Sequence, residues 1–262
     1  MEKKKKKRSF LSNIILIIAA VVFLFSAYKL FTAFSEYNKG DQEYEEIIEE
    51  VITEEVVEKE EDGKVVEEVV FTVDFEKLRA TNSEVVAWIR FENPSKISYP
   101  VVKTSDNEKY LKRTFEGKTN GSGTIFVDAA NLSDFTDKNT FIYGHNMKNG
   151  SMFGQLRKYK NESFCKENPY FYIYTPDGKE MKYQVFAVGI VEDTAESYQK
   201  VYEDDNAYQT YINHIKKISR YKTGVEVTTD SQIVSLSTCT NVTETQRLLV
   251  HGVKISEKMV GE

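Results

Sequence analysis

The sequence predicts a mainly β fold for residues 71–262, with about eight short strands that close into a barrel. Short apolar runs rich in valine, isoleucine and aromatic residues recur along this segment, and polar turns separate them. One turn, Thr-Pro-Asp-Gly at 175–178, joins two runs as a hairpin, because its proline presets φ and its glycine tolerates a positive φ. The expected strands cover residues 85–89, 99–102, 124–127, 140–143, 170–174, 182–188, 232–237 and 247–255.

Two helices are expected to accompany the barrel. Asp74 is a candidate N-cap for a short helix through Phe75 and Leu78. A longer helix is expected within residues 204–221, where apolar side chains recur at three- and four-residue steps and make one face apolar. We expect this helix to pack on the barrel, as an insertion before the strand at 232–237.

The N-terminus carries a membrane signal. A basic block at residues 3–8 precedes an apolar stretch at 10–31, and a helix needs about 20 mostly apolar residues to span a bilayer. The positive-inside rule places residues 1–9 in the cytoplasm as a basic tail and the rest of the chain outside. A cleaved signal peptide is the alternative, since small residues follow Phe25. Its apolar region would usually cover only about 7 to 15 residues, so the length favours a retained single-pass signal anchor.

Residues 32–70 form an acidic stalk or linker between this anchor and the predicted domain. Glutamates alternate here with aliphatic pairs, and the first three pairs recur at steps typical of an amphipathic helix, while Asp62-Gly63 breaks the pattern. A helical stalk and a solvated linker without fixed structure both remain open. Most of the net charge of -6 lies in this segment, so it does not indicate a cationic substrate.

Three residues that suit acyl transfer lie at the ends of expected strands. Cys239 follows an apolar run, Arg247 begins the next one, and His145 ends the run that starts at Phe141. A thiol with a reference pKa of about 8.5 is only partly ionised at neutral pH and needs electropositive neighbours to act as a thiolate. The second thiol, Cys165, has no motif around it. A disulfide between the two cysteines is an alternative outside the membrane, although a domain with an ample core does not require one.

The other two histidines suit this chemistry less well. His214 lies in the expected long helix, where it is most simply a surface or boundary residue. His251 lies four residues after Arg247 on one strand, hence about 13 Å away, so the two side chains do not easily serve one carbonyl group.

These residues support a resemblance to the sortase family, and in detail to its class B. The family signature is Thr-Leu-X-Thr-Cys with an arginine on the next strand, and this chain has Ser-Leu-Ser-Thr-Cys at 235–239 followed by Arg247. Residues 75–89 are similar to the N-terminal extension of class B members, and the helix before the catalytic strand is typical of them. The resemblance covers residues 73–255 and makes 71–262 an extracellular catalytic domain.

The resemblance implies a cysteine transpeptidase. Cys239 would be the nucleophile, His145 the acid and base, and Arg247 the group that holds the substrate carbonyl or its oxyanion. Leu236, Ser237 and Thr238 would contact the substrate, which is the sorting signal of a secreted surface protein. The acceptor would be an amine of a cell-wall precursor or of a pilin. No cofactor is implied.

Two features of the sequence qualify this resemblance. The family often has an acidic residue just after the cysteine, whereas Thr240-Asn241 here are neutral, so no role for that acid carries over. Some sortases of another branch bind calcium near the groove. Class B implies no metal, and we expect the nearby aspartates of this chain to form a solvated loop; they are Asp128, Asp134 and Asp137.

Alternatives remain for the function. A pilin-polymerising sortase and a non-catalytic scaffold of the cell envelope would both fit the anchor and the β domain. A papain-like peptidase fits poorly, because its local signature is absent and its histidine follows the cysteine in sequence. The chain lacks a basic patch with interleaved aromatic residues, so nothing indicates binding of nucleic acid.

Overall fold

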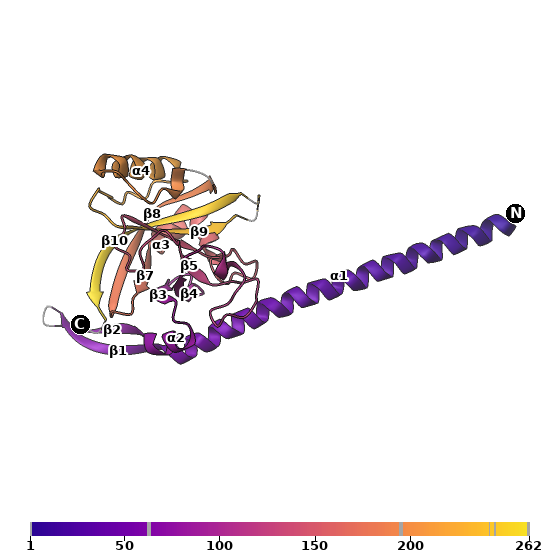
Figure 1. Ribbon diagram of the computed structural model, residues 1–262, viewed down its shortest axis with the longest axis horizontal. Coiled ribbons are helices and arrows are strands. Elements are labelled where there is room, and N and C mark those ends of the chain that lie inside the picture. Colours follow the sequence, from indigo (N-terminus) through magenta and orange to yellow (C-terminus); the bar gives the residue numbers. More distant parts are fainter. Residues whose placement is uncertain (1, 62–63, 194–195, 241, 244, 261–262) are drawn as a thin grey trace.

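The computed structural model describes residues 2–61, 64–193, 196–240, 242–243 and 245–260. In this part of the chain a long helix, a two-stranded hairpin and a closed barrel follow one another (Figure 1). The order around the barrel is β10-β8-β7-β3-β4-β5-β6-β9. Its strands are β3 (Val85–Arg90), β4 (Ser98–Lys103), β5 (Ile125–Val127), β6 (Asn139–Tyr143), β7 (Tyr170–Tyr174), β8 (Lys179–Glu192), β9 (Ile233–Cys239) and β10 (Gln246–Met259). The predicted mainly β fold, a closed barrel of eight strands, is confirmed.

The barrel is mixed rather than purely antiparallel. Most neighbouring strands are antiparallel, as in the expected hairpin of β7 and β8, but β4 and β5 are parallel and so are β6 and β9. In the second parallel pair Tyr143 lies opposite Ser237. Since parallel strands end on the same side, the segments that follow β6 and β9 meet at one edge of the barrel.

Both expected helices are present. In α2 (Phe75–Thr81) the Asp74 carboxylate accepts a hydrogen bond from the backbone N–H of Lys77 at 3.0 Å, which makes Asp74 the N-cap as predicted. In α4 (Asp205–Ile218) the side chain of Asp204 caps the helix in the same way. The helix lies between β8 and β9 in sequence and over the barrel in space (Figure 1). Its buried residues pack on Phe186, Ala187 and Val253 of the barrel; they are Tyr208, Tyr211, Ile212 and Ile215.

Shorter helical segments were not expected, because each is too short to show a helical period. They are the helix α3 (Glu162–Glu167) and three 3₁₀ turns, η1 (Lys109–Leu111), η2 (Gly154–Lys160) and η3 (Glu196–Tyr198).

Buried polar side chains connect β9 to the helix α4. The Ser235 hydroxyl donates to Asn139 Oδ1 at 2.7 Å, and His251 Nδ1 lies 2.7 Å from the same hydroxyl. Asn139 Nδ2 in turn donates to the Tyr211 hydroxyl at 2.7 Å. Burial lowers the pKa of His251 to about 3, so this histidine is neutral at physiological pH. Its role is therefore structural, in line with the preference for His145 as the catalytic histidine.

The segment before the barrel differs from the expected stalk or solvated linker. The helix α1 (Glu2–Val51) continues without a break from the apolar stretch to Val51, and a hairpin of β1 (Ile52–Glu61) and β2 (Lys64–Val73) follows. Tyr44, Ile47 and Val51 are buried in the same core as the barrel. The aliphatic pairs beyond Val51 thus belong to strands rather than to a helix. The expected break at Asp62-Gly63 lies outside the described residues.

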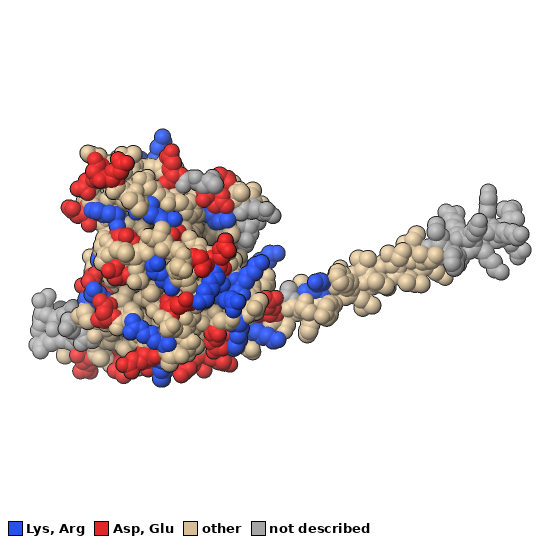
Figure 2. Space-filling view, viewed as in Figure 1, with Lys and Arg blue, Asp and Glu red and all other residues tan. Residues whose placement is uncertain are grey.

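The N-terminal part of α1 is long and apolar enough to cross a membrane. Its large apolar side chains between Ile14 and Phe34 are exposed, so no other described part of the molecule covers them. Figure 2 shows this part as a rod with few charged atoms that leads away from the barrel.

The buried His251 makes the stability of the protein depend on pH. Its folded pKa of about 3 lies below the ordinary value of about 6.5, so only the unfolded state takes up a proton as the pH falls from 6.5 to 3. We expect the free energy of unfolding to fall by about 2 kcal/mol between pH 7.5 and pH 5 from this group alone. Urea unfolding at the two pH values measures the difference. His251→Gln should remove this contribution and His214→Gln should retain it; equal pH dependence of His251→Gln and wild type would contradict the assignment.

Candidate active site

A cleft of about 370 Å³ opens at the barrel edge where β6 and β9 end. Cys239, His145 and Arg247, the three residues expected to carry the chemistry, all line it. The other lining residues come from the β4–β5 connection, from β5, β6 and β9, and from the segment after β8. They are Asn107, Leu111, Thr124, Phe126, Asp128, Tyr143, Gly144, Asp193, Tyr198, Lys200, Ser237 and Thr238.

Cys239 is the last residue of β9, and its free thiol is partly exposed in the cleft. Its backbone carbonyl accepts a hydrogen bond of 2.7 Å from Asn146 Nδ2, which ties the end of β9 to the residue after His145. The alternative disulfide is not formed, because both thiols are free. Cys165 lies buried in α3, and burial raises the pKa of its thiol, which keeps it protonated and unreactive.

His145 lies two residues beyond Tyr143, as Cys239 lies two residues beyond Ser237, so the parallel register brings both to the same edge. The N–H of Gly144 donates to the Ser237 carbonyl at 3.2 Å and continues this pairing. His145 Nε2 is 2.7 Å from the carbonyl oxygen of Leu111. A carbonyl only accepts hydrogen bonds, so Nε2 carries a proton and Nδ1 is the nitrogen left for proton transfer.

Arg247 lies directly opposite Cys239 in the antiparallel pairing of β9 with β10. Side chains at such positions have Cβ atoms about 4.5–5.5 Å apart and share one face of the sheet. The guanidinium donates to Asp193 Oδ2 at 3.2 Å and to the Gln246 carbonyl at 3.2 Å. Asp193, which follows β8, therefore holds the Arg247 side chain at the cleft.

The three residues expected to contact substrate are placed differently from one another. Ser237 lines the cleft and its hydroxyl is 2.8 Å from that of Tyr198. Thr238 also lines the cleft, and in the described part of the chain its buried hydroxyl has no hydrogen-bond partner. Leu236 is fully buried in the barrel core and is not among the lining residues, which differs from the expected contact. The reason is the alternation of side chains along β9, which turns Leu236 inward.

A buried ion pair in the cleft was not predicted. Lys200 Nζ lies 2.8 Å from Asp128 Oδ2, and the Tyr143 hydroxyl donates to the same oxygen at 2.7 Å. Burial alone would raise the pKa of the Asp128 carboxyl, but the hydrogen bonds from Lys200 and Tyr143 outweigh it and hold that pKa below its ordinary value. Asp128 is 1% exposed, so the expectation of a solvated loop is wrong for this residue.

The other two aspartates of that expectation are satisfied within their own loop. Asp134 accepts from Thr136, and Asp137 accepts from the backbone N–H of Leu132. Among the described residues, no group of three or more histidine, cysteine or acidic side chains is arranged to hold a metal ion.

Aromatic rings form a second wall of the cleft that the sequence did not indicate. Tyr198 stacks on Phe141 and Tyr143, with ring centroids 5.3 and 6.5 Å apart. Burial raises the pKa of Tyr198 to about 12, so its hydroxyl remains protonated beside Ser237. Tyr198 and Lys200 lie in the connection between β8 and α4, which has no hydrophobic period and gave no sequence signal.

A thiol, an imidazole and a guanidinium thus meet at one end of an open cleft. The thiol supplies a nucleophile, the imidazole transfers protons, and the guanidinium stabilises an oxyanion. This combination is suited to acyl transfer through a covalent thioester intermediate.

Comparisons with known proteins agree with this geometry. A family model described as the sortase domain matches residues 93–255. Sortase B of Listeria monocytogenes is 32% identical over 236 residues, which cover 89% of this chain and 92% of the relative. Sortase B of Staphylococcus aureus is 32% identical over 184 residues, or 69% of this chain and 74% of the relative. The crystal structure of sortase B from Bacillus anthracis superposes with a TM-score of 0.69 at 30% identity, covering 85% of this chain and 99% of that one.

The ion pair of Lys200 and Asp128 gives a test of the cleft wall. Lys200→Met leaves a buried carboxylate without its cation, and we expect a loss of about 2 kcal/mol in the free energy of unfolding, between the values for exposed and buried pairs. The double variant Lys200→Met/Asp128→Asn should be more stable than Lys200→Met, because no charge is left unpaired. Urea unfolding of both proteins at pH 7 measures this difference. A double variant no more stable than the single one would contradict the pairing.

Proposed function

The chain belongs to the sortase family, and on that premise we propose that it is a membrane-anchored transpeptidase that attaches secreted surface proteins to an amine of the cell wall. It would cleave a C-terminal sorting signal of these proteins. The observation that carries the proposal is the placement of Cys239, His145 and Arg247 at one end of the cleft, with Arg247 in register opposite the thiol.

The first step forms a thioester. The Cys239 thiolate attacks the carbonyl carbon of the scissile peptide bond, and negative charge develops on the carbonyl oxygen. Arg247 stabilises this oxyanion from the neighbouring strand. The intermediate collapses as the C–N bond breaks, and His145 donates a proton to the leaving amine. The N-terminal part of the substrate is then held on Cys239.

The second step transfers the acyl group. The acceptor amine attacks the thioester carbon, Arg247 again stabilises the oxyanion, and His145 takes the proton from the attacking amine. The C–S bond breaks, which regenerates the Cys239 thiolate and releases an amide. His145 ends the cycle protonated, as it began, so the two steps balance. Splitting one difficult reaction into two easier ones is the advantage of the covalent route.

Relatives support the choice of substrate classes. Sortase B of Staphylococcus aureus has been described as a substrate complex, and a sortase B has been crystallised with a glycine tripeptide. We infer for this chain a sorting-signal peptide in the cleft and a primary amine, such as that of a glycine peptide, as the acceptor. An amine of a pilin would make the same chain a pilin-polymerising enzyme.

The N-terminal helix supports a location at the membrane surface. We infer that residues 10–31 of α1 span the membrane, that residues 1–9 lie in the cytoplasm, and that the barrel lies outside the cell. Tyr44 packs against the barrel 13 residues beyond Phe31, or about 20 Å along the helix axis. The cleft would thus be held close to the outer membrane surface, where secreted substrates emerge.

Intact-mass spectrometry of the full chain in detergent tests the proposal. The protein is incubated with a panel of sorting-signal peptides, and then with triglycine or with a lysine-containing pilin peptide. We expect a hydroxylamine-labile acyl adduct on wild type and on the control Cys165→Ala, and no adduct on Cys239→Ala. The adduct should resolve to an amide with one of the two amines, which separates wall anchoring from pilin assembly.

Two further variants test the assigned roles. His145→Ala and Arg247→Ala should each lower the acylation rate by about 10²–10³-fold, as expected for loss of an acid–base group or an oxyanion donor. Arg247→Ala should keep the fold, since its side chain is at the cleft surface. A wild-type protein that is folded, has a free Cys239 thiol and forms no adduct with any peptide would argue for a non-catalytic role instead.

A further inference from the structure

The loop of residues 104–124 carries one wall of the cleft and the backbone oxygen that holds His145. Leu111 and Thr124 line the cleft, and the Leu111 carbonyl accepts from His145 Nε2 at 2.7 Å. Any group that fixes this loop therefore influences the position of the imidazole.

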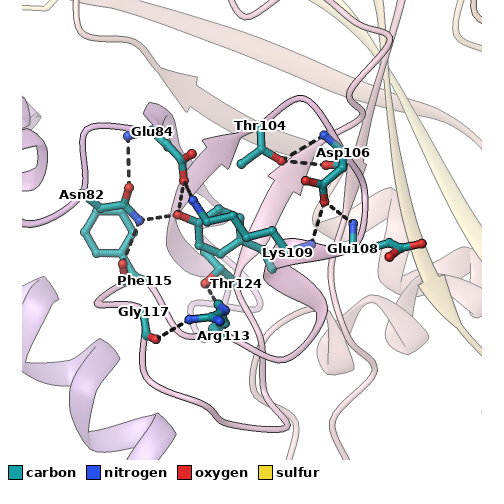
Figure 3. Close-up of polar contacts among 11 residues, drawn as sticks. Asn82, Glu84, Thr104, Asp106, Glu108, Lys109, Arg113, Phe115, Gly117 and Thr124 are labelled. Carbon is teal, nitrogen blue, oxygen red and sulfur yellow. Dashed lines mark hydrogen bonds and ion pairs between the residues drawn. The ribbon is translucent and has the colours of Figure 1, made fainter.

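One side of the loop is fixed by polar contacts with the start of β3 (Figure 3). The Asp106 carboxylate accepts from the backbone N–H groups of Glu108 and Lys109 at 2.8 Å each and caps the 3₁₀ turn η1. The Tyr110 hydroxyl donates to Glu84 Oε2 at 2.6 Å and accepts from Asn82 Nδ2 at 2.7 Å. Leu111 is the last residue of this anchored turn.

The other side of the loop is fixed by the helix α1. Glu36 Oε1 accepts from the N–H of Gly121 at 2.7 Å, and Glu43 Oε1 accepts from the N–H of Glu116 at 3.1 Å. These carboxylates supply hydrogen-bond partners to the loop backbone from a segment more than 70 residues earlier in the chain. The loop is thus held between the barrel and the helix that leads from the N-terminus.

Tyr44 makes the contact of α1 that lies nearest to the catalytic residues. Its ring is 3% exposed and packs edge-on against Tyr99 with centroids 5.3 Å apart. Its hydroxyl donates to the Gly123 carbonyl at 2.7 Å. The Thr124 hydroxyl, 3.2 Å from the Tyr44 oxygen, already donates to the Arg113 carbonyl, so the Tyr44 proton serves Gly123.

Gly123 is wedged between the two groups that define the imidazole position. It has a φ of +61°, and a Cβ built on it would lie 3.0 Å from the Leu111 carbonyl oxygen and 3.1 Å from His145 Cδ2. It would also lie 2.5 Å from the Tyr110 carbonyl oxygen. Only glycine fits here, and a shift of its peptide by a few tenths of an ångström would change either contact.

We propose that Tyr44 is a positioning residue for His145. Its hydroxyl holds Gly123 in place, and Gly123 in turn keeps the imidazole against the Leu111 carbonyl. The helix that leads from the membrane is then part of the catalytic scaffold. This inference rests on the proposed function, in which His145 transfers protons.

The test uses the full chain with Tyr44→Phe, which removes the hydroxyl and keeps the ring packing. We expect kcat of transpeptidation to fall about 10-fold, which corresponds to about 1.4 kcal/mol, while KM changes less than two-fold. The ¹H–¹⁵N correlation of His145 Nε2–H should shift or broaden. A merely structural role would not move this signal.

Tyr221→Phe is the matched control. The Tyr221 hydroxyl also donates to a backbone carbonyl, that of Tyr159 at 2.6 Å, and Tyr221 does not line the cleft. It should lose similar thermal stability and keep the kcat and the His145 signal of wild type. Equal kcat values for Tyr44→Phe and Tyr221→Phe would overturn the proposal.

Two more variants separate the possible failures. Gly123→Ala presses on the same two groups with Tyr44 intact, so it should lower kcat and move the His145 signal; wild-type behaviour would also overturn the proposal. His145→Ala tests the underlying function. If it is inactive while Tyr44→Phe behaves like wild type, the positioning role alone fails. If it remains active, the acid–base role fails with it.

Discussion

The parallel pairing of β6 with β9 is the constraint on which the active site depends. It sets Tyr143 opposite Ser237, and both strands end there, so His145 and Cys239 emerge at one barrel edge although 94 residues separate them in sequence. The antiparallel partner β10 then sets Arg247 opposite Cys239. Three side chains are thus placed by backbone hydrogen bonds of a closed barrel, which has no free edge along which the register could slip.

The groups around these three residues have a common physical task, because a cleft that excludes water must satisfy its own polar atoms. Asp193 holds the guanidinium of Arg247, and the Leu111 carbonyl holds His145. Lys200 and Tyr143 satisfy the buried Asp128, where an unpaired carboxylate would be strongly destabilising. Two of these partners, Asp193 and Lys200, come from the connection between β8 and α4. That connection is therefore part of the site, and the helix α4 behind it anchors its far end.

The sequence predicted what depends on local pattern, and it failed where tertiary contacts decide. The strands, the cap Asp74 and the apolar face of α4 follow from side-chain period and turn chemistry. The cleft trio follows from the motif around Cys239. Leu236 was misplaced because the motif gives residue types without the inward or outward alternation of the strand. Tyr198 and Lys200 gave no signal, since their stacking and pairing join segments far apart in sequence. The docking of Tyr44 was hidden in a glutamate-rich segment whose composition is typical of solvated chain.

The continuity of α1 joins the question of membrane location to that of catalysis. Phe34 is an exposed apolar residue of the helix, and Glu36, only two residues and about 3 Å further along the axis, already bonds to the loop of residues 104–124. When the apolar part spans a bilayer, unbroken helix therefore connects the lipid to the barrel. A flexible tether would let the cleft sample many heights and orientations, whereas a docked helix gives it one. Because the same helix also contacts the loop that holds His145, the element that sets the position of the enzyme on the membrane also helps to set the geometry of its catalytic histidine.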